Sequence, residues 1–380
     1  MKIEMVDLKG QYNKIKSEVD QAMIACVESA EFINGTLVSE FSNNLSKYVG
    51  VKYVIPCANG TDALQISLMA LGLKPGDEVI VPAFTYVATA EVIGLLNLVP
   101  VLVDVMPEDF SINLDQVKNS ITPKTKAIVP VHLFGQCVGM EELLEFAKIN
   151  KIYIVEDAAQ AIGSKYTFKD GSKKQAGTMG DIGTTSFFPS KNLGCYGDGG
   201  AIFTDNENLA FRIKMMANHG QSKKYQHDVI GVNSRLDTLQ AAILNIKLKY
   251  LNDYCNSRNS AAEYYDKYLS EIEEIVIPSR SNNSSHVFHQ YTIKVKNGKR
   301  DELKTFLQEK GIPTMVYYPF PLHFQKAYKS NRFPKGSLPI SEKLCEEVLS
   351  LPIHTEMTNE IQNFIVISIA EFFKHNFLNG

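Results

Sequence analysis

Short apolar runs alternate with longer segments of helical periodicity between residues 51 and 204. The apolar runs, which predict β-strands, cover 51–57, 78–82, 99–105, 126–132, 152–157, 184–188 and 201–204. Helices are predicted between them, where apolar positions recur every three or four residues, over 61–71, 85–96, 114–120 and 140–150. Repeated β-then-α units of this length indicate a mainly parallel sheet with helices on both faces, an α/β fold.

The pattern changes on either side of these units. Two helices are predicted over 10–30 and 36–49, separated at Asn34-Gly35, and one long helix or two over 237–268. Strands are then expected over 289–295 and 314–318, and helices over 301–310, 340–349 and 359–373. We therefore predict a large domain over 1–250 and a smaller C-terminal α+β domain over 251–380.

Composition narrows the class of protein. The 380 residues are 44% hydrophobic and 21% charged, as in soluble globular proteins. The net charge of −3 comes from interspersed charges, which gives no sign of a nucleic-acid surface or a membrane-binding patch. No apolar run approaches the roughly 18 residues of a spanning helix, and the first residues lack the apolar core of a signal peptide. These features predict a cytoplasmic protein.

Cysteine and histidine spacing argues against a metal site or a disulfide framework. The six cysteines are scattered without a C-x-x-C pair, so buried free thiols are expected. His286-x-x-His289 resembles half of a metal site, but no acid or cysteine cluster lies near it in sequence. We predict no metal.

Polar residues follow several predicted strands, at the edge where open α/β sheets bind ligands. After the first strand, Gly60 allows close backbone approach, and Thr61 and Asp62 begin a helix whose free N–H groups attract an anion such as phosphate. The alternative is an ordinary capped helix. Tyr86 follows the next strand, where it could stack on a flat ring or belong to the core.

Two later strand ends add a carboxylate and an amine. Asp157, preceded by Glu156, ends an apolar strand, where a carboxylate is costly unless it faces a cation such as a protonated pyridine nitrogen. Gln160 lies one turn further on, within reach of a ring hydroxyl. Ser186 offers a hydroxyl to a phosphate, and Lys191 offers an amine to a carbonyl. A lysine Schiff base with an aspartate on the ring nitrogen is how proteins hold pyridoxal 5′-phosphate (PLP). A solvated strand end and a surface lysine are the alternatives.

The positions of the arginines limit how the large domain could bind an anion. No arginine precedes residue 212, so amides and hydroxyls must do most of any phosphate binding in the large domain. Arg235 lies just before a predicted helix. It would form either a salt bridge with Asp237 or a planar fork for a carboxylate or phosphate.

These motifs together resemble the DegT/DnrJ/StrS family of sugar aminotransferases, which are fold-type I PLP enzymes. The resemblance runs from Ile33 to Pro352 and rests on four segments, Asn59-Gly60-Thr61-Asp62-Ala63-Leu64, Glu156-Asp157-Ala158-Ala159-Gln160, Ser186-Phe187-Phe188-Pro189-Ser190-Lys191 and Gly231-Val232-Asn233-Ser234-Arg235-Leu236-Asp237. It implies a mainly parallel sheet of the seven-stranded type. It also implies that Lys191 bonds to the cofactor, that Asp157 pairs with its ring nitrogen, and that Tyr86 stacks on the ring near Gln160. By the same resemblance, Gly60, Thr61, Asp62 and Ser186 hold the phosphate, and Asn233 reaches the phosphate of a neighbouring subunit in a homodimer.

Within the family, the chain is most similar to the WbpE-type subgroup, which aminates the 3-keto group of UDP-2-acetamido-2-deoxy-3-oxo-glucuronate for O-antigen synthesis. There, the arginine matching Arg235 faces the sugar carboxylate, and Tyr317 and Tyr318 match a segment that lines the sugar site. Tyr317 departs from the histidine expected in the nearest relatives. The resemblance implies a transamination with glutamate as amino donor. Alternative substrates are dTDP- or UDP-linked 3- or 4-keto-6-deoxyhexoses, and the alternative of another class is a non-catalytic regulator that binds sugar nucleotides.

Overall fold

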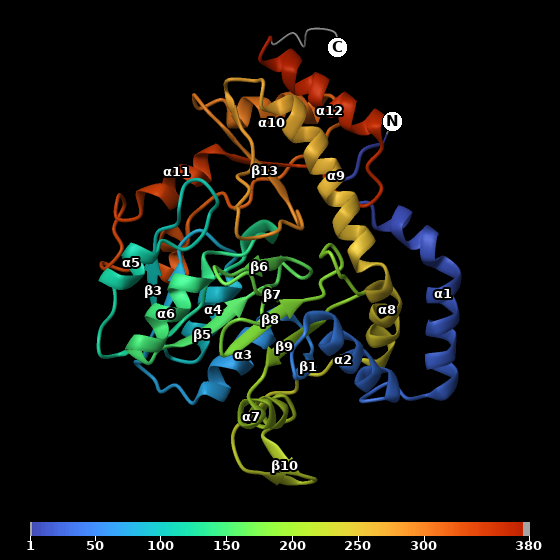
Figure 1. Cartoon of the computed structure of the whole chain (residues 1–380), viewed down its shortest axis with the longest axis vertical. Coiled ribbons are helices and arrows are strands. Elements are labelled where there is room, and N and C mark those ends of the chain that lie inside the picture. The colour runs from blue at the N-terminus through green and yellow to red at the C-terminus, as the bar shows by residue number, and fades with distance from the viewer. Residues whose placement is uncertain (1, 375–380) are drawn as a thin grey trace.

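A seven-stranded sheet forms the centre of the computed structural model, which describes residues 2–374 (Figure 1). Its strands lie in the order β1-β9-β8-β5-β4-β2-β3. Only β9 runs antiparallel to its neighbours, so the predicted mainly parallel sheet is confirmed. The strand bounds are β1 (Tyr53–Cys57), β2 (Glu78–Pro82), β3 (Val99–Val103), β4 (Thr125–Ile128), β5 (Tyr153–Asp157), β8 (Ile182–Ser186) and β9 (Gly200–Thr204).

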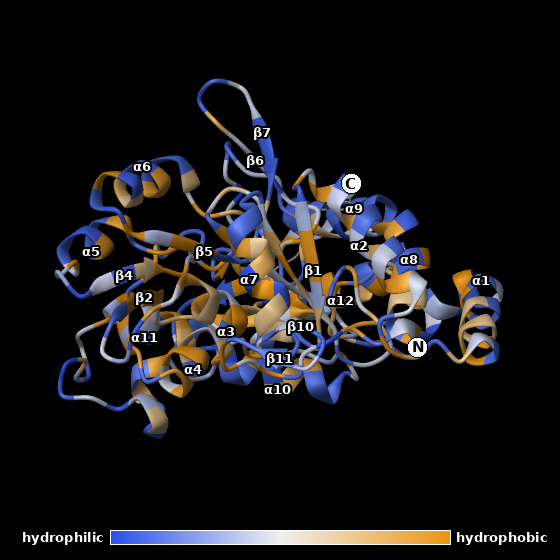
Figure 2. Cartoon of the chain, turned by 90° about the horizontal axis from the view of Figure 1, so that it is seen from below, coloured by the Kyte–Doolittle hydropathy of each residue, from blue (hydrophilic) through white to orange (hydrophobic). Residues whose placement is uncertain are grey.

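Side chains alternate between the two faces of this sheet, and each face is covered by helices. Val79 and Val81 of β2 pack in one hydrophobic cluster and Ile80 in another, as a period of two requires. The first cluster includes α3 (Gly60–Leu71), α4 (Ala88–Leu95) and α7 (Glu207–Ala217). On the opposite face, α5 (Leu114–Asn119) and α6 (Met140–Asn150) cover one half of the sheet, and α2 (Thr36–Val49) and α8 (Thr238–Lys249) the other. Figure 2 shows hydrophobic residues in α3, α4 and β5, whereas the hairpin strand β7 is hydrophilic.

The C-terminal part has its own core. It contains the three-stranded sheet β12 (Ile275–Val276), β13 (Tyr291–Val295) and β14 (Val348–Leu351), with α10 (Arg300–Glu309), α11 (Pro339–Glu347) and α12 (Asn359–Phe372). The helix α9 (Leu251–Leu269) packs into both cores, with Leu251 in that of the large sheet and Tyr265 in the C-terminal one. The domain division at residue 250 stays a prediction.

The chain crosses between these two cores a second time, near its N-terminus. Ile3 belongs to the C-terminal core, and the amide of Ile353 donates to the carbonyl of Met5 over 3.4 Å. The helix α1 (Leu8–Ser29) then descends beside α8, on the right in Figure 1. Lys14 of α1 also forms an ion pair of 2.6 Å with Glu356.

Several predicted elements differ from the structure. The strand predicted over 314–318 is wrong, because only Met315 pairs, through one bridge to Ser350. The helix predicted over 340–349 ends at Glu347, and the chain continues as β14 because Val348 and Leu349 are completely buried against β13. The helix α7 was not predicted, although its buried positions recur at helical spacing.

Short hairpins were also missed. These are β6 (Lys165–Thr167) with β7 (Lys173–Gln175), and β10 (Gln221–Lys223) with β11 (Gln226–His227). All six cysteines are buried and free, as predicted. Within residues 2–374, no helix has the length and apolarity that crossing a bilayer requires.

Candidate active site

Four parallel strands bring most of the predicted site residues to one edge of the sheet. Gly60 begins α3 shortly after β1, and Tyr86 follows β2. Asp157 is the last residue of β5, and Ser186 is the last of β8, with Lys191 five residues further along. Because the carboxyl ends of parallel strands meet at the same edge, these residues gather at the edge that binds ligands in such sheets.

The start of α3 offers donors for an anion beside Ser186. Asn59 caps the helix, since its Oδ1 accepts from the amide of Asp62 over 2.8 Å. In the described part of the chain, the amides of Gly60 and Thr61 have no hydrogen-bond acceptor, as the first amides of a helix usually do not. A Cβ on Gly60 would lie 2.8 Å from Cβ of Ser186, so only glycine allows this approach. These amides and the Ser186 hydroxyl fit a phosphate group.

Asp157 is a buried carboxylate that contacts no cation. It is 6% exposed, and its Oδ2 accepts from the hydroxyl of Thr89 over 2.9 Å. The amide of Ala159 donates to Oδ1 over 3.1 Å. None of the ion pairs between described residues includes Asp157. A buried carboxylate held this way fits the protonated nitrogen of a pyridine ring. Thr89 was not predicted, although its position at the start of a helix after a strand end was a usable signal.

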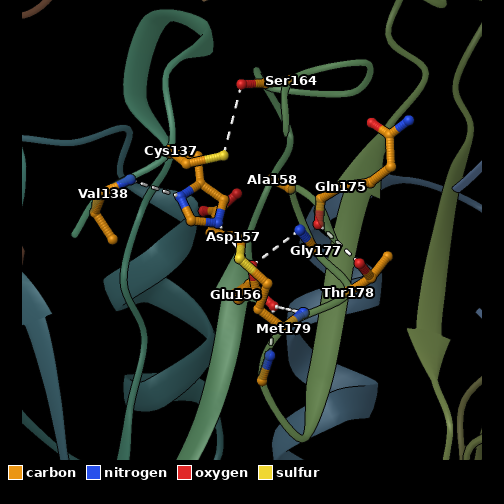
Figure 3. A network of polar contacts seen from close by, with 12 residues as sticks. Cys137, Val138, Glu156, Asp157, Ala158, Ser164, Gln175, Gly177, Thr178 and Met179 are labelled. Carbon is orange, nitrogen blue, oxygen red and sulfur yellow. Dashed lines mark hydrogen bonds and ion pairs between the residues drawn. The ribbon is translucent and has the colours of Figure 1, made fainter. Parts of the chain in front are cut away.

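The neighbouring acid, Glu156, has a different environment (Figure 3). Its side chain is fully buried and accepts four hydrogen bonds. Three come from the amides of Gly177, Met179 and Gly180, over 2.9, 2.6 and 2.6 Å. The fourth comes from Nε2 of His132 over 2.8 Å. The amide of Val138 donates to Nδ1 of His132, so this imidazole must carry its proton on Nε2. Glu156 therefore fixes the turn at 177–180 behind the site.

Lys191 is partly buried, and its amine is set up to act as a nucleophile. Burial lowers the pKa of Lys191 to about 8, while Asp157 acts in the opposite direction. At pH 7, about one amine in ten is then uncharged, against about one in 3,000 for an ordinary lysine. The uncharged amine is the form that attacks an aldehyde. Among residues 2–374, no side chain or carbonyl forms a hydrogen bond or ion pair with this amine.

Aromatic side chains and Gln160 line the same edge. Tyr86 is 58% exposed, and its ring centroid lies 6.3 Å from that of Tyr318. Gln160 accepts from the amide of Phe134 over 2.8 Å and donates to the hydroxyl of Tyr318 over 3.2 Å. Burial raises the pKa of Tyr318, which keeps its hydroxyl protonated. Tyr317 is adjacent, with its ring centroid 6.1 Å from that of Tyr318.

Asn233 and Arg235 lie in a separate place. They line a cavity of about 420 Å³ together with Ala58, Gln240 and two acids, Asp198 and Asp237, and Lys191 does not line it. Ser234 links this segment to the phosphate loop, since its hydroxyl accepts from the amide of Ala58 over 3.1 Å. Within the described residues, Arg235 makes no ion pair, so the alternative of a salt bridge with Asp237 is not borne out.

The residues at the sheet edge thus supply what PLP requires: an anion site, a buried carboxylate, an exposed aromatic ring and a low-pKa amine. Their individual roles stay predictions. The role of Asp62 is the least supported, because its amide is already used by Asn59.

Comparison with known proteins agrees with this chemistry. The chain is 45% identical over 377 residues to a "Pleiotropic regulatory protein" of Geobacillus stearothermophilus, covering 99% of this chain and 100% of that one. It is 44% identical over 352 residues to a UDP-2-acetamido-2-deoxy-3-oxo-D-glucuronate aminotransferase of Pseudomonas aeruginosa, covering 93% and 95%.

Solved structures show the same fold. A DegT/DnrJ/EryC1/StrS aminotransferase from Brucella abortus superposes with a TM-score of 0.93 at 40% identity, covering 98% of this chain and 99% of that one. NtdA from Bacillus subtilis, which was solved with bound cofactor PMP, superposes with a TM-score of 0.87 at 34% identity, covering 96% and 83%. The model of the DegT/DnrJ/EryC1/StrS aminotransferase family matches residues 13–370. The chain therefore belongs to the DegT/DnrJ/EryC1/StrS family and is a PLP-dependent sugar aminotransferase.

Proposed function

We propose that the enzyme moves an amino group from glutamate to C3 of UDP-2-acetamido-2-deoxy-3-oxo-glucuronate, in the synthesis of a bacterial surface polysaccharide such as O-antigen. The observation that carries this proposal is the guanidinium of Arg235, which lines a cavity that Asp198 and Asp237 also line, yet forms no ion pair with them or with any other acid among residues 2–374. A planar guanidinium binds a carboxylate through two parallel hydrogen bonds. A uronate sugar carries such a carboxylate, and the Pseudomonas relative is named for one.

The residues at the sheet edge have distinct proposed tasks. When bound, PLP supplies an electron sink that stabilises negative charge on the substrate carbon. Gly60, Thr61, Asp62 and Ser186 hold its phosphate, and Tyr86 stacks on the ring. Asp157 holds the proton on the ring nitrogen, and Gln160 lies near the ring hydroxyl. Lys191 is the catalytic base and acid: its uncharged Nζ takes the proton from the α-carbon of glutamate, and the same nitrogen returns a proton to the sugar carbon in the second half of the cycle.

We further propose a homodimer that shares its active sites. Asn233 is exposed and lies away from Lys191 in the same chain, and the nearby loop exposes Tyr225 at 81% and Ile230 at 88%. Large exposed apolar side chains around a polar segment are typical of an interface. In the dimer, Asn233 would reach the partner's phosphate, and Arg235 the carboxylate of the substrate bound there. Tyr317 and Tyr318 would line the sugar site.

The deciding experiment separates the two half-reactions. Protein converted to its amino form with glutamate, and freed of 2-oxoglutarate, is mixed with keto-sugars that differ only in the C6 carboxylate. We expect the uronate to restore the aldehyde spectrum fastest and to yield the amino sugar by mass spectrometry. Arg235→Ala should raise KM for the uronate at least about 30-fold. Removing one partner of a buried charge pair costs about 2–5 kcal/mol of binding free energy, and the lower end applies here because Arg235 is partly exposed.

Arg235→Lys is the matched control, since it keeps the charge without the planar fork, and it should recover only part of the loss. If Arg235→Ala leaves KM for the uronate unchanged, the uronate assignment is wrong. A 3- or 4-keto-6-deoxyhexose linked to dTDP or UDP is then favoured, as in relatives named for dTDP-amino sugars.

A regulatory role is the alternative favoured by the name of the Geobacillus relative. A regulator that binds sugar nucleotides without catalysis would not need the low-pKa amine of Lys191. Purified protein that stays colourless with added PLP, and converts no keto-sugar, would favour this alternative.

A further inference from the structure

Gln240 holds the loop that follows Lys191 through two hydrogen bonds to a single residue. Its Oε1 accepts from the amide of Tyr196 over 2.9 Å, and its Nε2 donates to the carbonyl of Tyr196 over 3.3 Å. Gln240 itself lies in the first turn of α8, directly after the segment that carries Arg235. Its side chain therefore connects the loop after Lys191 to the Arg235 segment.

Asp198 lies in the part of this loop whose position depends on that connection. On one side of it, the backbone is fixed by Gln240, and a Cβ on Gly197 would lie only 3.0 Å from Nε2 of Gln240. On the other side, the carbonyl of Gly199 accepts from the amide of Phe187 over 2.7 Å. Glycines flank Asp198 and leave its backbone many conformations, so these two anchors decide where its carboxylate lies.

The carboxylate of Asp198 shares a cavity with the guanidinium of Arg235. Both residues line the cavity of about 420 Å³ described above, together with Gln240 and Asp237. Opposite charges in one cavity attract, yet neither acid forms an ion pair with Arg235 within residues 2–374. Asp237 is held by a backbone bridge to Ile33, whereas Asp198 is held through Gln240. The loop anchor thus separates Asp198 from an available cation.

We propose that Gln240 is a positioning residue for Arg235: by fixing the loop after Lys191, it keeps Asp198 from pairing with the guanidinium and leaves Arg235 free for the carboxylate of the substrate. The proposal rests on the proposed function, in which Arg235 binds the uronate, and deepens it. Without the anchor, Asp198 becomes an internal competitor, and the affinity for the uronate falls by the fraction of time that it occupies Arg235.

The test measures KM of the PLP-loaded enzyme for the uronate and for a keto-sugar that lacks only the C6 carboxylate. Gln240→Met keeps the length of the side chain and removes both hydrogen bonds. It should raise KM for the uronate about fivefold, the order expected when a partly exposed ion pair competes with the substrate. KM for the sugar without the carboxylate should not change, whereas a general disturbance of the site would raise both.

A second substitution at Asp198 identifies the competitor. Asp198→Asn alone should leave KM for the uronate unchanged, because Asp198 is not paired with Arg235 in the wild type. In Gln240→Met/Asp198→Asn, the competitor has lost its charge, so KM should return to the wild-type value. Gln362→Met is the matched control, since it removes a hydrogen bond of 3.0 Å to the carbonyl of Ala261 in the C-terminal core and should change neither KM.

Gly197→Ala perturbs the same anchor without altering Gln240, because the new Cβ presses on its Nε2. It should give a smaller rise in KM for the uronate, which Asp198→Asn again removes. This variant decides the matter if Gln240→Met is not recovered as folded protein.

Three results would overturn the proposal: an unchanged KM for the uronate in Gln240→Met and Gly197→Ala, an equal rise for both sugars, or a rise that Asp198→Asn does not remove. Failure of the proposed function looks different. If Arg235→Ala leaves KM for the uronate unchanged, the uronate assignment is wrong and both proposals fall together. A large effect of Arg235→Ala with none of Gln240→Met refutes only the role of Gln240.

Discussion

The Glu156→Gln substitution should lower the unfolding free energy far more than the Asp157→Asn substitution. The two acids are adjacent, and each substitution exchanges one carboxylate oxygen for an NH2 group. All four partners of Glu156 are donors, three backbone amides and Nε2 of His132. A glutamine NH2 must therefore face two of these donors, in either orientation, and leave both unpaired.

His132 cannot remove this cost by changing its tautomer. If its ring gave up the Nε2 proton to accept from the new NH2, the proton would move to Nδ1, where the amide of Val138 already donates. Two buried donors without acceptors cost about 1–3 kcal/mol each, so Glu156→Gln should lose about 2–6 kcal/mol of unfolding free energy.

Asp157→Asn is the matched control. Its oxygen can keep the amide of Ala159, and its NH2 can donate to the hydroxyl of Thr89, which rotates to accept. This variant should stay within about 1 kcal/mol of the wild type and lose activity instead, because in the proposed function Asp157 is the carboxylate that faces the ring nitrogen of the cofactor. The test compares the urea concentrations at which the cofactor-free wild type, Glu156→Gln and Asp157→Asn proteins are half unfolded. A Glu156→Gln midpoint equal to that of Asp157→Asn would refute the cost assigned to the two unpaired donors.

Three further outcomes follow from the geometry. The rate at which cofactor-free protein takes up PLP should rise with pH with a midpoint near 8, the pKa of Lys191, because deprotonation frees the amine; a midpoint near 10.5 would contradict its burial. Arg258→Met leaves three buried backbone carbonyls unpaired and should lower the unfolding free energy by about 2–4 kcal/mol, measured by urea denaturation, with Arg258→Lys intermediate. Gly183→Ala would place a Cβ 1.8 Å from the carbonyl oxygen of Gly177 and should abolish soluble expression, whereas Gly139→Ala meets nothing within 4 Å and should express normally.

The sheet and its ligand-binding edge were predictable because their signals are local. Each β-strand is a short apolar run, and the residues that gather at the edge lie within a few positions of a strand end. Because the strands are parallel, their carboxyl ends lie at one edge of the sheet, and this can be predicted without knowing any contact between distant residues.

The parts that could not be predicted depend on contacts between distant segments. The resemblance assigned the ring nitrogen to Asp157, but nothing in the sequence showed that the neighbouring Glu156 would bind the amides of the turn at 177–180. The link between the loop after Lys191 and α8 depends on hydrogen bonds between residues 44 apart in sequence, Tyr196 and Gln240. The region at 314–318 has strand-like composition, yet pairs only at Met315, because tertiary context overrides propensity.

The chain passes between the two cores more than twice. Besides the connections before α1 and along α9, Leu322 and Leu338 pack in a core of the large sheet, between Ile312 and Leu349 of the C-terminal core. Buried Asp104 also accepts from the amide and the hydroxyl of Ser341, over 2.7 and 2.6 Å. Cutting the chain between Met5 and α1 would therefore leave the C-terminal part attached to the large sheet, without touching a residue of the active site.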